Sequence, residues 1–353
     1  MNKILIKPKN ILVRMPNWLG DLVMATPILK DLRNHWPEAK ITAYCQGALG
    51  AVIQGDPNIN ECLNFKRPHG FFRKQDRLEI ANPLKKGQYD LGILLTNSFS
   101  SALWFWRGNV QNRIGYADHF RSILLNYPIP FPSTRETQHL VTTYKMLLEP
   151  LGIPLSNTDP KLYVSYEEKI TAQKQLSDLG IASSNIIVGI NPGAAYGAAK
   201  CWIPDRFQEV VKKLIENPKI VVLFFGDKAG TPLVNEICKV FPERVINFAG
   251  KTNLRQFMAL IQCCHIFLTN DSGPMHMASA LGIPLLALFG STSDVATGPY
   301  RGGKVIHKHV SCSPCYRREC PIDFRCMTQI GVDEVYNELN ILLQKQPLKP
   351  YES

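Results

Sequence analysis

The chain has 353 residues, more than one ordinary hydrophobic core holds, and this length indicates two domains. Hydrophobic residues make up 45% of the chain and charged residues 20%, a composition typical of a globular protein that excludes a disordered one. No apolar run approaches the ~20 residues that span a bilayer, and Met1–Lys9 is not followed by an apolar signal-peptide core. We therefore expect a cytoplasmic protein.

The net charge of +11 comes mainly from the first half of the chain. Residues 1–165 contain 20 Lys and Arg against 12 Asp and Glu. Such a surplus attracts nucleic acid, an anionic membrane surface or a phosphorylated substrate, or it is an ordinary basic surface. Within it, Lys66–Lys86 mixes cations with aromatic residues, so this stretch either contacts anionic lipid or phosphate groups or is a solvated loop.

Strand-like and helix-like segments alternate from the first residues onward, a pattern typical of parallel sheets with crossover helices. In the first half we expect a strand over Asn10–Arg14 and a helix from about Asp21 to Trp36. Further strands are expected over Lys40–Cys45 and Tyr89–Leu95, with an irregular segment over Phe65–Lys86.

The second half repeats this alternation. Five strands are expected there: Ile186–Asn191, Ile220–Gly226, Val245–Phe248, His265–Asn270 and Pro284–Phe289. The sequence thus predicts an α/β fold with two doubly wound, Rossmann-like domains, residues 1–165 and 166–353, that face each other across a cleft. Because open α/β sheets bind ligands beyond the carboxyl ends of their strands, the loops at those ends are the candidate sites.

The first candidate loop, residues 14–21, joins the first strand to the first helix. We expect Asp21 at the N-cap of that helix, where it either accepts bonds from the free helix amides or acts chemically at the mouth of a cleft. Gly20 beside it indicates the close approach of a ligand or an unusual backbone angle.

The second candidate loop, residues 191–204, contains small residues and the single cation Lys200. Small residues leave backbone amides open, and a lysine adds a point charge, so this loop is a plausible phosphate cradle. It has neither the Gly-Lys-Ser/Thr ending of a Walker motif nor the Gly-x-Gly-x-x-Gly dinucleotide fingerprint, and the missing fingerprint disfavours a dehydrogenase.

The third candidate loop, residues 270–276, ends a strand and opens a helix. Asp271 or Ser272 is expected to cap that helix, and Gly273 leaves room for a ligand. A diphosphate here would gain from the helix dipole, and His276 would lie about one turn into the helix on the face turned toward it. The alternative is that residues 270–276 only cap the helix and bind no ligand.

These loops, in this order, resemble the heptosyltransferase family of lipopolysaccharide core synthesis. The resemblance lies in Gly20-Asp21, in the segment from Lys200 through Trp202 to Pro204, and in the Asn-Asp-Ser-Gly-x-x-His motif ending at His276. Two further stretches are similar to family members that add the second heptose: residues 97–103, and Arg113–Tyr116 with Leu124–Asn126. The resemblance covers nearly the whole chain.

The resemblance implies a GT-B fold, an ADP-heptose donor bound by the second domain, and a phosphorylated lipid A–Kdo–heptose acceptor bound by the first. The last helix is expected to pack back on the first domain. It also implies a peripheral position at the anionic inner leaflet, and no nucleic acid, cofactor or metal. An Asp-x-Asp pair, which metal-dependent glycosyltransferases use to hold a cation, is absent from the sequence.

The resemblance also implies a role for individual residues in catalysis and in binding the donor and the acceptor. Asp21 matches the proposed general base of an inverting displacement, and Lys200 matches the lysine at the phosphates. The residues that match the family's donor site are Thr252, Asp271, Ser272, Gly273 and His276. Those that match its acceptor site are Gly20, Asn97 and Ser98. The chain departs from the family pattern at Ala195 and Ala198, where Glu and Pro are expected, and this affects the sugar contacts of that loop.

Four cysteines form the cluster Cys312-x2-Cys315-x4-Cys320-x5-Cys326. In a reducing compartment such a cluster could close a structural zinc site, although its last two gaps fit no common pattern. Free thiols and a local disulfide are the other possibilities.

Two other functions fit parts of the sequence. A nucleotide-sugar epimerase or a different core glycosyltransferase would share the fold, but an epimerase needs its own acid/base pair. A basic nucleic-acid-binding protein would explain the pI of about 9.1 and leave the three phosphate-type loops without a role.

Overall fold

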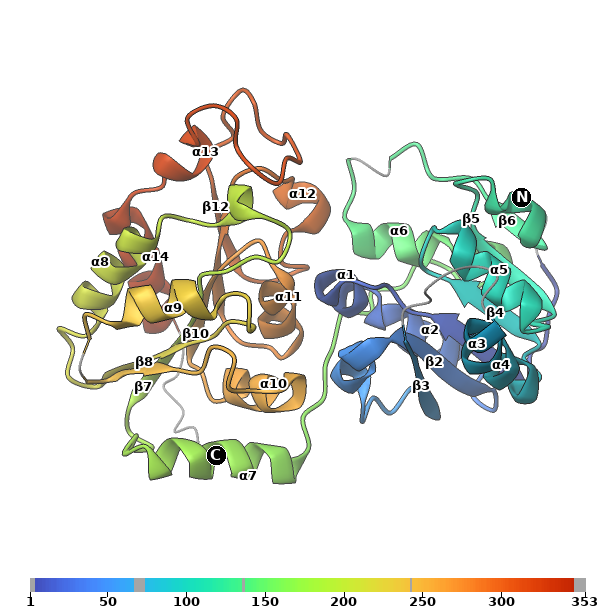
Figure 1. Cartoon of the computed structure of the whole chain (residues 1–353), viewed down its shortest axis with the longest axis horizontal. Helices are drawn as coiled ribbons and strands as arrows, with labels where there is room; N and C mark the ends of the chain where they lie inside the picture. The colour runs from blue at the N-terminus through green and yellow to red at the C-terminus, as the bar shows by residue number, and fades with distance from the viewer. Residues whose placement is uncertain (1–3, 67–73, 135–136, 242, 346–353) are drawn as a thin grey trace. The chain divides into compact units, whose positions relative to one another are not determined.

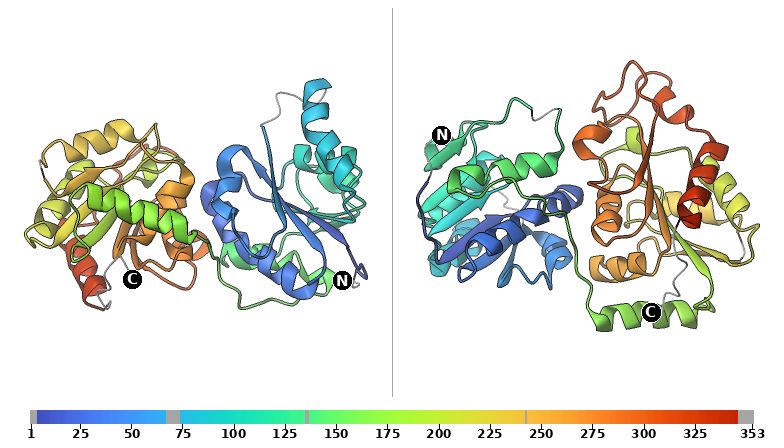
Figure 2. Two further views of the ribbon diagram at one scale, coloured as in Figure 1. Left: turned by 90° about the horizontal axis from the view of Figure 1, so that it is seen from below. Right: turned by 180° about the vertical axis from the view of Figure 1, so that it is seen from behind.

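The computed structural model describes residues 4–66, 74–134, 137–241 and 243–345. The chain divides into two compact units, Met1–Tyr163 and Val164–Ser353, which run from blue to green and from green to red in Figure 1. Each unit is built on a parallel six-stranded sheet with helices on both faces (Figure 2). The predicted α/β class with two doubly wound sheets is confirmed.

The sheet of the first unit has the order β3-β2-β1-β4-β5-β6. Its strands are β1 (Asn10–Arg14), β2 (Lys40–Gln46), β3 (Glu61–Phe65), β4 (Leu91–Leu94), β5 (Asn112–Tyr116) and β6 (Tyr127–Ile129). The register pairs Asn10 of β1 with Lys40 of β2, and Ile11 of β1 with Leu91 of β4. The strand order reverses between β1 and β4, so these two strands mark the switch point of the first sheet.

The helices of the first unit are α1 (Leu19–Met24), α2 (Thr26–His35), α3 (Lys74–Asp76), α4 (Asn82–Gly87), α5 (Phe99–Arg107) and α6 (Leu140–Met146), with the short turns η1 (Gly47–Ile53), η2 (Arg77–Ala81), η3 (Arg121–Leu124) and η4 (Glu149–Leu151). The single helix expected from Asp21 is two helices, because Pro27 has no amide to donate to the Val23 carbonyl. The Thr26 hydroxyl donates to that carbonyl instead, at 2.8 Å.

The basic stretch Lys66–Lys86 lies partly outside the described residues, which omit 67–73. From Lys74 onward the chain is helical, through α3, the π-helical turn η2 and α4. The expectation of an irregular segment is wrong for this part. Leu84 of α4 is fully buried in the core of the first unit, and that packing explains why the segment folds.

The sheet of the second unit has the order β12-β11-β10-β7-β8-β9. Its strands are β7 (Ile186–Asn191), β8 (Ile220–Phe224), β9 (Val245–Asn247), β10 (Ile266–Asn270), β11 (Leu285–Phe289) and β12 (Lys304–His307). The switch point lies between β7 and β10, whose register pairs Thr269 with Asn191 at the carboxyl end. Side chains of β7, β8, β10 and β11 form the core of this unit.

The helices of the second unit are α7 (Tyr166–Asp178), α8 (Pro204–Leu214), α9 (Thr231–Cys238), α10 (Leu254–Gln262), α11 (Gly273–Ala280), α12 (Asp294–Thr297), α13 (Arg325–Thr328) and α14 (Val332–Gln344), with the turn η5 (Ala198–Lys200). Capping boxes begin α7 and α10, and Arg255 of α10 forms an ion pair with Glu168 of α7. The last helix, α14, packs its buried Val335 and Leu339 into the core of the second unit, in contact with α8 and β10.

No described helix is long and apolar enough to cross a bilayer.

Candidate functional site

The loops at the switch point of the second sheet contain most of the predicted donor residues. Residues 191–204 follow β7 and residues 270–276 follow β10, and these two strands are neighbours. The carboxyl ends of adjacent parallel strands meet at one edge, so the two loops lie side by side there.

An ion pair joins the two loops. Nζ of Lys200 donates to Oδ2 of Asp271 at 2.5 Å, and the two side chains are only 14% and 4% exposed. The Thr292 hydroxyl donates to the same carboxylate oxygen, also at 2.5 Å. Because an ammonium has three N–H donors, the bond to Asp271 leaves donors for a bound anion. The site therefore presents a positioned cation beside a helix N-terminus.

The Asn270 side chain, at the start of the loop after β10, forms hydrogen bonds to two points of the loop after β7. Its Oδ1 accepts from the Trp202 amide at 3.1 Å, and its Nδ2 donates to the Pro192 carbonyl at 2.6 Å. The indole of Trp202 is buried, and its Nε1 donates to the Ile330 carbonyl at 3.2 Å. These bonds satisfy buried polar groups and hold the loop before α8 in one conformation.

The start of α11 differs from the expected cap. Ser272 occupies the N-cap position, but its hydroxyl lies 3.0 Å from the hydroxyl of Thr269, and Asp271 is bonded to Lys200. Among the described residues no side-chain bond caps α11, so its first amides are available to an anion. Gly273 is the first helical residue, and His276 is buried one turn further on.

The loop after β7 is covered by the segment around residues 316–318, which lies more than 100 residues further along the chain. The Tyr196 hydroxyl donates to the Tyr316 carbonyl at 2.5 Å, and the Ala199 amide donates to the Arg318 carbonyl at 2.9 Å. A side chain at Gly197 would place its Cβ only 2.4 Å from that Arg318 oxygen, so only glycine fits there.

Sequence reasoning missed Thr292 and Arg318. Thr292 had a usable signal, because it follows a predicted strand and so lies at the same edge of the sheet. Arg318 had none, since it lies among the cysteines and far along the chain from the loop that it covers.

Thr252 lies at the same edge of the sheet but further from the ion pair. It follows β9, which is two strands away from β7, and precedes α10, where Asn253 forms the cap. The structure leaves its assignment to the donor site as a prediction.

At the first sheet, Asp21 follows β1 as expected but does not cap a helix. Helix α1 begins at Leu19 after the N-cap residue Trp18, so Asp21 is half-buried inside the first turn, next to Gly20. The N-cap prediction is therefore wrong. The pKa of Tyr144 on α6 is raised well above its usual value, mainly by burial and also by the negative charge of Asp21. The Asp21 carboxylate is therefore close enough to α6 to act on Tyr144.

The backbone before α1 is held by Arg14. Its buried guanidinium donates to the carbonyl of Met15 and to Oδ1 of Asn17, the latter at 2.5 Å, and stacks 4.6 Å from the Phe65 ring centre. Burial lowers the pKa of Arg14 to about 10, which leaves it charged at neutral pH.

Asn97 and Ser98 follow β4, the neighbour of β1, and lie at the same edge as Asp21. Ser98 caps α5 by accepting the Ser101 amide at 3.3 Å, and Asn97 Oδ1 accepts from the buried Arg121 at 3.4 Å. Both residues therefore have structural bonds in addition to any contact with a ligand.

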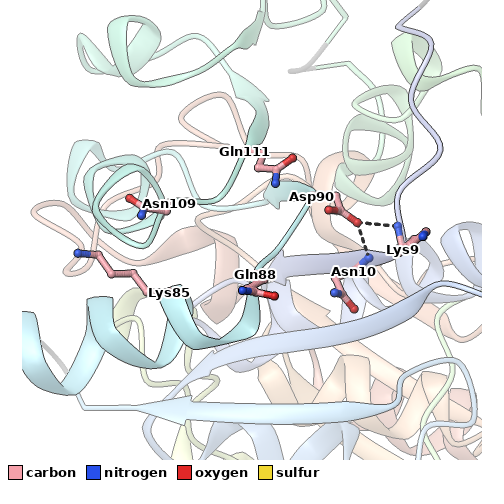
Figure 3. Close-up of a pocket in the computed structure, with 7 residues that line it drawn as sticks. All are labelled: Lys9, Asn10, Lys85, Gln88, Asp90, Asn109 and Gln111. Atoms are coloured by element: carbon pink, nitrogen blue, oxygen red, sulfur yellow. Dashed lines mark hydrogen bonds between the residues drawn. The ribbon is translucent and has the colours of Figure 1, made fainter.

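A polar depression of about 480 Å³ in the first unit lies at the opposite edge of its sheet. Figure 3 shows it at the amino ends of the strands, where Asp90 accepts the amides of Lys9 and Asn10 at 2.7 and 2.9 Å. Its lining residues are Lys9, Asn10, Lys85, Gln88, Asp90, Asn109 and Gln111. Since ligands of open α/β sheets bind at the carboxyl edge, we do not assign the function to this depression.

The four clustered cysteines are free thiols, three of them exposed and Cys326 buried. Burial raises the pKa of the Cys326 thiol above its ordinary value. Among the described residues, however, the one group of three or more ligand atoms within 4.8 Å of one another lies elsewhere, at Asp294, His307 and His309.

Comparison with known proteins gives consistent matches. A family model described as glycosyltransferase family 9 (heptosyltransferase) matches residues 77–324. Lipopolysaccharide heptosyltransferase 2 of Salmonella typhimurium is 32% identical over 299 residues, which cover 82% of this chain and 85% of that protein.

Two solved structures have the same fold over nearly the whole chain. The structure of E. coli ADP-heptose lps heptosyltransferase II is 28% identical with a TM-score of 0.82, covering 95% of this chain and 99% of that one. The glycosyltransferase family 9 structure from Veillonella parvula is 24% identical with a TM-score of 0.86, covering 98% and 100%. These matches confirm the expected GT-B type of fold.

Proposed function

Because the chain belongs to glycosyltransferase family 9, the heptosyltransferase family, we propose that it transfers L-glycero-D-manno-heptose from ADP-heptose to the first heptose of the lipopolysaccharide inner core. It is a glycosyltransferase, and its relatives support heptose transfer in core synthesis. The observation that carries the finer proposal is the buried Lys200–Asp271 pair beside the open N-terminus of α11.

The second unit supplies the donor site in this proposal. Lys200 and the first amides of α11 contact the diphosphate of ADP-heptose, with Ser272, Gly273 and His276 around it and Thr252 nearer the adenine. As ADP leaves, negative charge grows on the diphosphate, and a cation and amides already in place stabilise that charge. This set of groups needs no metal ion for the transfer step.

The first unit supplies the acceptor site and the base. An acceptor hydroxyl oxygen attacks the anomeric carbon while the bond from that carbon to the diphosphate breaks. Asp21 takes the hydroxyl proton, so the products are the extended acceptor with inverted configuration and ADP. Gly20, Asn97 and Ser98 surround the acceptor at the switch point between β1 and β4.

The enzyme acts in the cytoplasm at the inner leaflet in this proposal. The basic surplus of the first half, 20 cations against 12 acidic residues, supports attraction to anionic lipid and to a phosphorylated acceptor.

The test is ADP release from ADP-heptose in the presence of a lipid A–Kdo core that carries one heptose. The expected result is release that requires the acceptor, together with an acceptor mass increased by one heptose. Release without an acceptor, or a donor converted to an isomer, would contradict transfer and favour the epimerase. Tight ADP binding with no release would redirect the assay to other sugars and acceptors.

A further inference from the structure

A histidine and carboxylate cluster lies at the end of the second sheet, apart from the residues proposed for transfer. Asp294 begins α12, His307 ends β12, and His309 follows two residues later. Their ligand atoms all lie within 4.8 Å of one another. We propose that these three side chains bind a divalent transition-metal ion, with Zn²⁺ as the ion that fits best.

The proton positions around His307 support a cation at this place. The single hydroxyl proton of Ser313 is donated to the Gly290 carbonyl at 2.5 Å, so Ser313 Oγ accepts from His307 Nε2 at 2.9 Å. A neutral His307 ring therefore carries its proton on Nε2 and turns the lone pair of Nδ1 toward Asp294 Oδ1, 3.0 Å away. This imidazole nitrogen and this carboxylate oxygen face each other, as two ligands of one metal ion do.

The second imidazole supplies a third ligand close to the same point. Nε2 of His309 lies 3.6 Å from Asp294 Oδ2, and the centres of the two imidazole rings are 4.0 Å apart. A metal ion binds both rings in their neutral form.

The distances fit tetrahedral coordination. Zn–N and Zn–O bonds of about 2.0–2.2 Å place tetrahedral ligand atoms roughly 3.3 Å apart. His307 Nδ1 lies 3.0 Å from Oδ1 of Asp294 and His309 Nε2 lies 3.6 Å from Oδ2, so each nitrogen is near that distance from one oxygen of the carboxylate. Two imidazoles with one carboxylate suit Zn²⁺ better than Mg²⁺ or Ca²⁺, which prefer oxygen ligands. His309 is 66% exposed, so water can fill the fourth position.

The surrounding contacts give the ion a structural role. Ser313 holds the far side of the His307 ring, as the second shell of a zinc ligand does. The Ser291 carbonyl accepts the amides of Cys315 and Tyr316, and Thr292 bonds to Asp271. A metal at Asp294 would thus stabilise the loop between β11 and α12, whose Thr292 bonds to Asp271.

The experiment uses the full-length chain without a polyhistidine tag, stripped with EDTA and titrated with Co²⁺ and Zn²⁺ alone. We expect one ion per chain, a rise in Tm with Zn²⁺, and a Co²⁺ spectrum of four-coordinate type that lacks thiolate charge-transfer bands. His309→Ala and Asp294→Asn should each weaken binding at least tenfold, and Ser313→Ala by about tenfold to a hundredfold.

Two controls keep the test decisive. His309→Ala removes an exposed side chain, so its Tm in EDTA should equal that of the parent chain, which separates loss of metal from loss of fold. Cys312→Ser with Cys315→Ser should leave the titration unchanged. The proposal is overturned if no ion binds, if the Co²⁺ spectrum shows thiolate bands that the cysteine variant abolishes, or if His309→Ala and Asp294→Asn bind metal as the parent does.

Discussion

The carboxyl edges of the two sheets have the same strand arrangement, but they differ in how far their charged and aromatic side chains are buried. At the edge of the second sheet, Lys200 and Asp271 are buried and bonded to each other. At the edge of the first sheet, Asp21 is half-buried, and apolar Trp18 and Phe120 are 53% and 93% exposed. The charged groups of the second edge are thus buried, whereas the first edge has large aromatic side chains exposed to solvent.

This difference matches what each edge is proposed to bind. A nucleotide diphosphate has a fixed charge and shape, so a site whose cation and amides are already in place loses little free energy in ordering itself. An acceptor on a lipid is large and partly apolar, and a more open surface with exposed aromatic side chains suits it. Four substitutions test this contrast between the two edges.

Asp21→Asn is expected to have the largest effect, and only on the chemical step. Removing a general base typically lowers turnover about 10²–10⁴-fold, while the second edge should still bind ADP with unchanged affinity. Rates of acceptor-dependent ADP release and ADP titrations measure both quantities. An equal loss of turnover and ADP affinity would assign Asp21 a structural role.

Lys200→Met is expected to damage the second edge in two ways. Loss of a charged contact to the diphosphate should raise the Kd for ADP about 10- to 100-fold. The unpaired, buried Asp271 should also lower the free energy of unfolding by about 3 kcal/mol. The double variant Lys200→Met with Asp271→Asn should regain stability without regaining ADP affinity. Unchanged ADP binding in Lys200→Met would remove the lysine from the donor site.

Gly197→Ala tests whether the segment around Arg318 holds the loop after β7 in its conformation. The new Cβ would lie 2.4 Å from the Arg318 carbonyl oxygen, and such overpacking costs about 1–3 kcal/mol. Urea unfolding and ADP titration should both show a loss. Gly193→Ala in the same loop is the matched control, because no atom lies within 4 Å of its added Cβ. Equal behaviour of the two variants would show that the covering contact has no influence.

Ser98→Ala is expected to have the smallest effect on stability, about 1 kcal/mol for a lost N-cap. Ser165→Ala, at the cap of α7 in the other unit, should cost a similar amount. Only Ser98→Ala should also raise the KM for the acceptor, with ADP affinity unchanged. If neither variant changes the KM for the acceptor, Ser98 has only the structural role of an N-cap and does not bind the acceptor.

Much of the fold could be predicted because buried strands have continuous apolar sequences. Asn10–Arg14 and Ile186–Asn191 are strands with the expected bounds. Four strands were not predicted: β3, β6 and β12 lie at the edges of their sheets, and β5 lies next to an edge. Edge strands are half-exposed and short, so their sequences lack that signal, and Pro128 within β6 argues against a strand.

The candidate site could be predicted by position but not by contact. Strand and helix order placed Lys200 and Asp271 at one edge, yet nothing in the sequence indicated that they bond to each other. The N-cap role of Asp21 was wrong because α1 begins two residues earlier, and cap positions are decided by backbone angles that composition does not reveal. The pairing of Asp294 with His307 likewise depends on how α12 and β12 pack.

The Asn270 side chain has a consequence for how the protein is made. Its bonds to Trp202 and Pro192 span 68 and 78 residues of chain, and the Trp202 indole reaches Ile330 across 128. During synthesis, the loop around Lys200 leaves the ribosome well before its partners Asn270 and Ile330 have been made. The proposed donor site is therefore among the last parts of the second unit to form, and a nascent chain that ends before residue 330 lacks a contact that holds that loop.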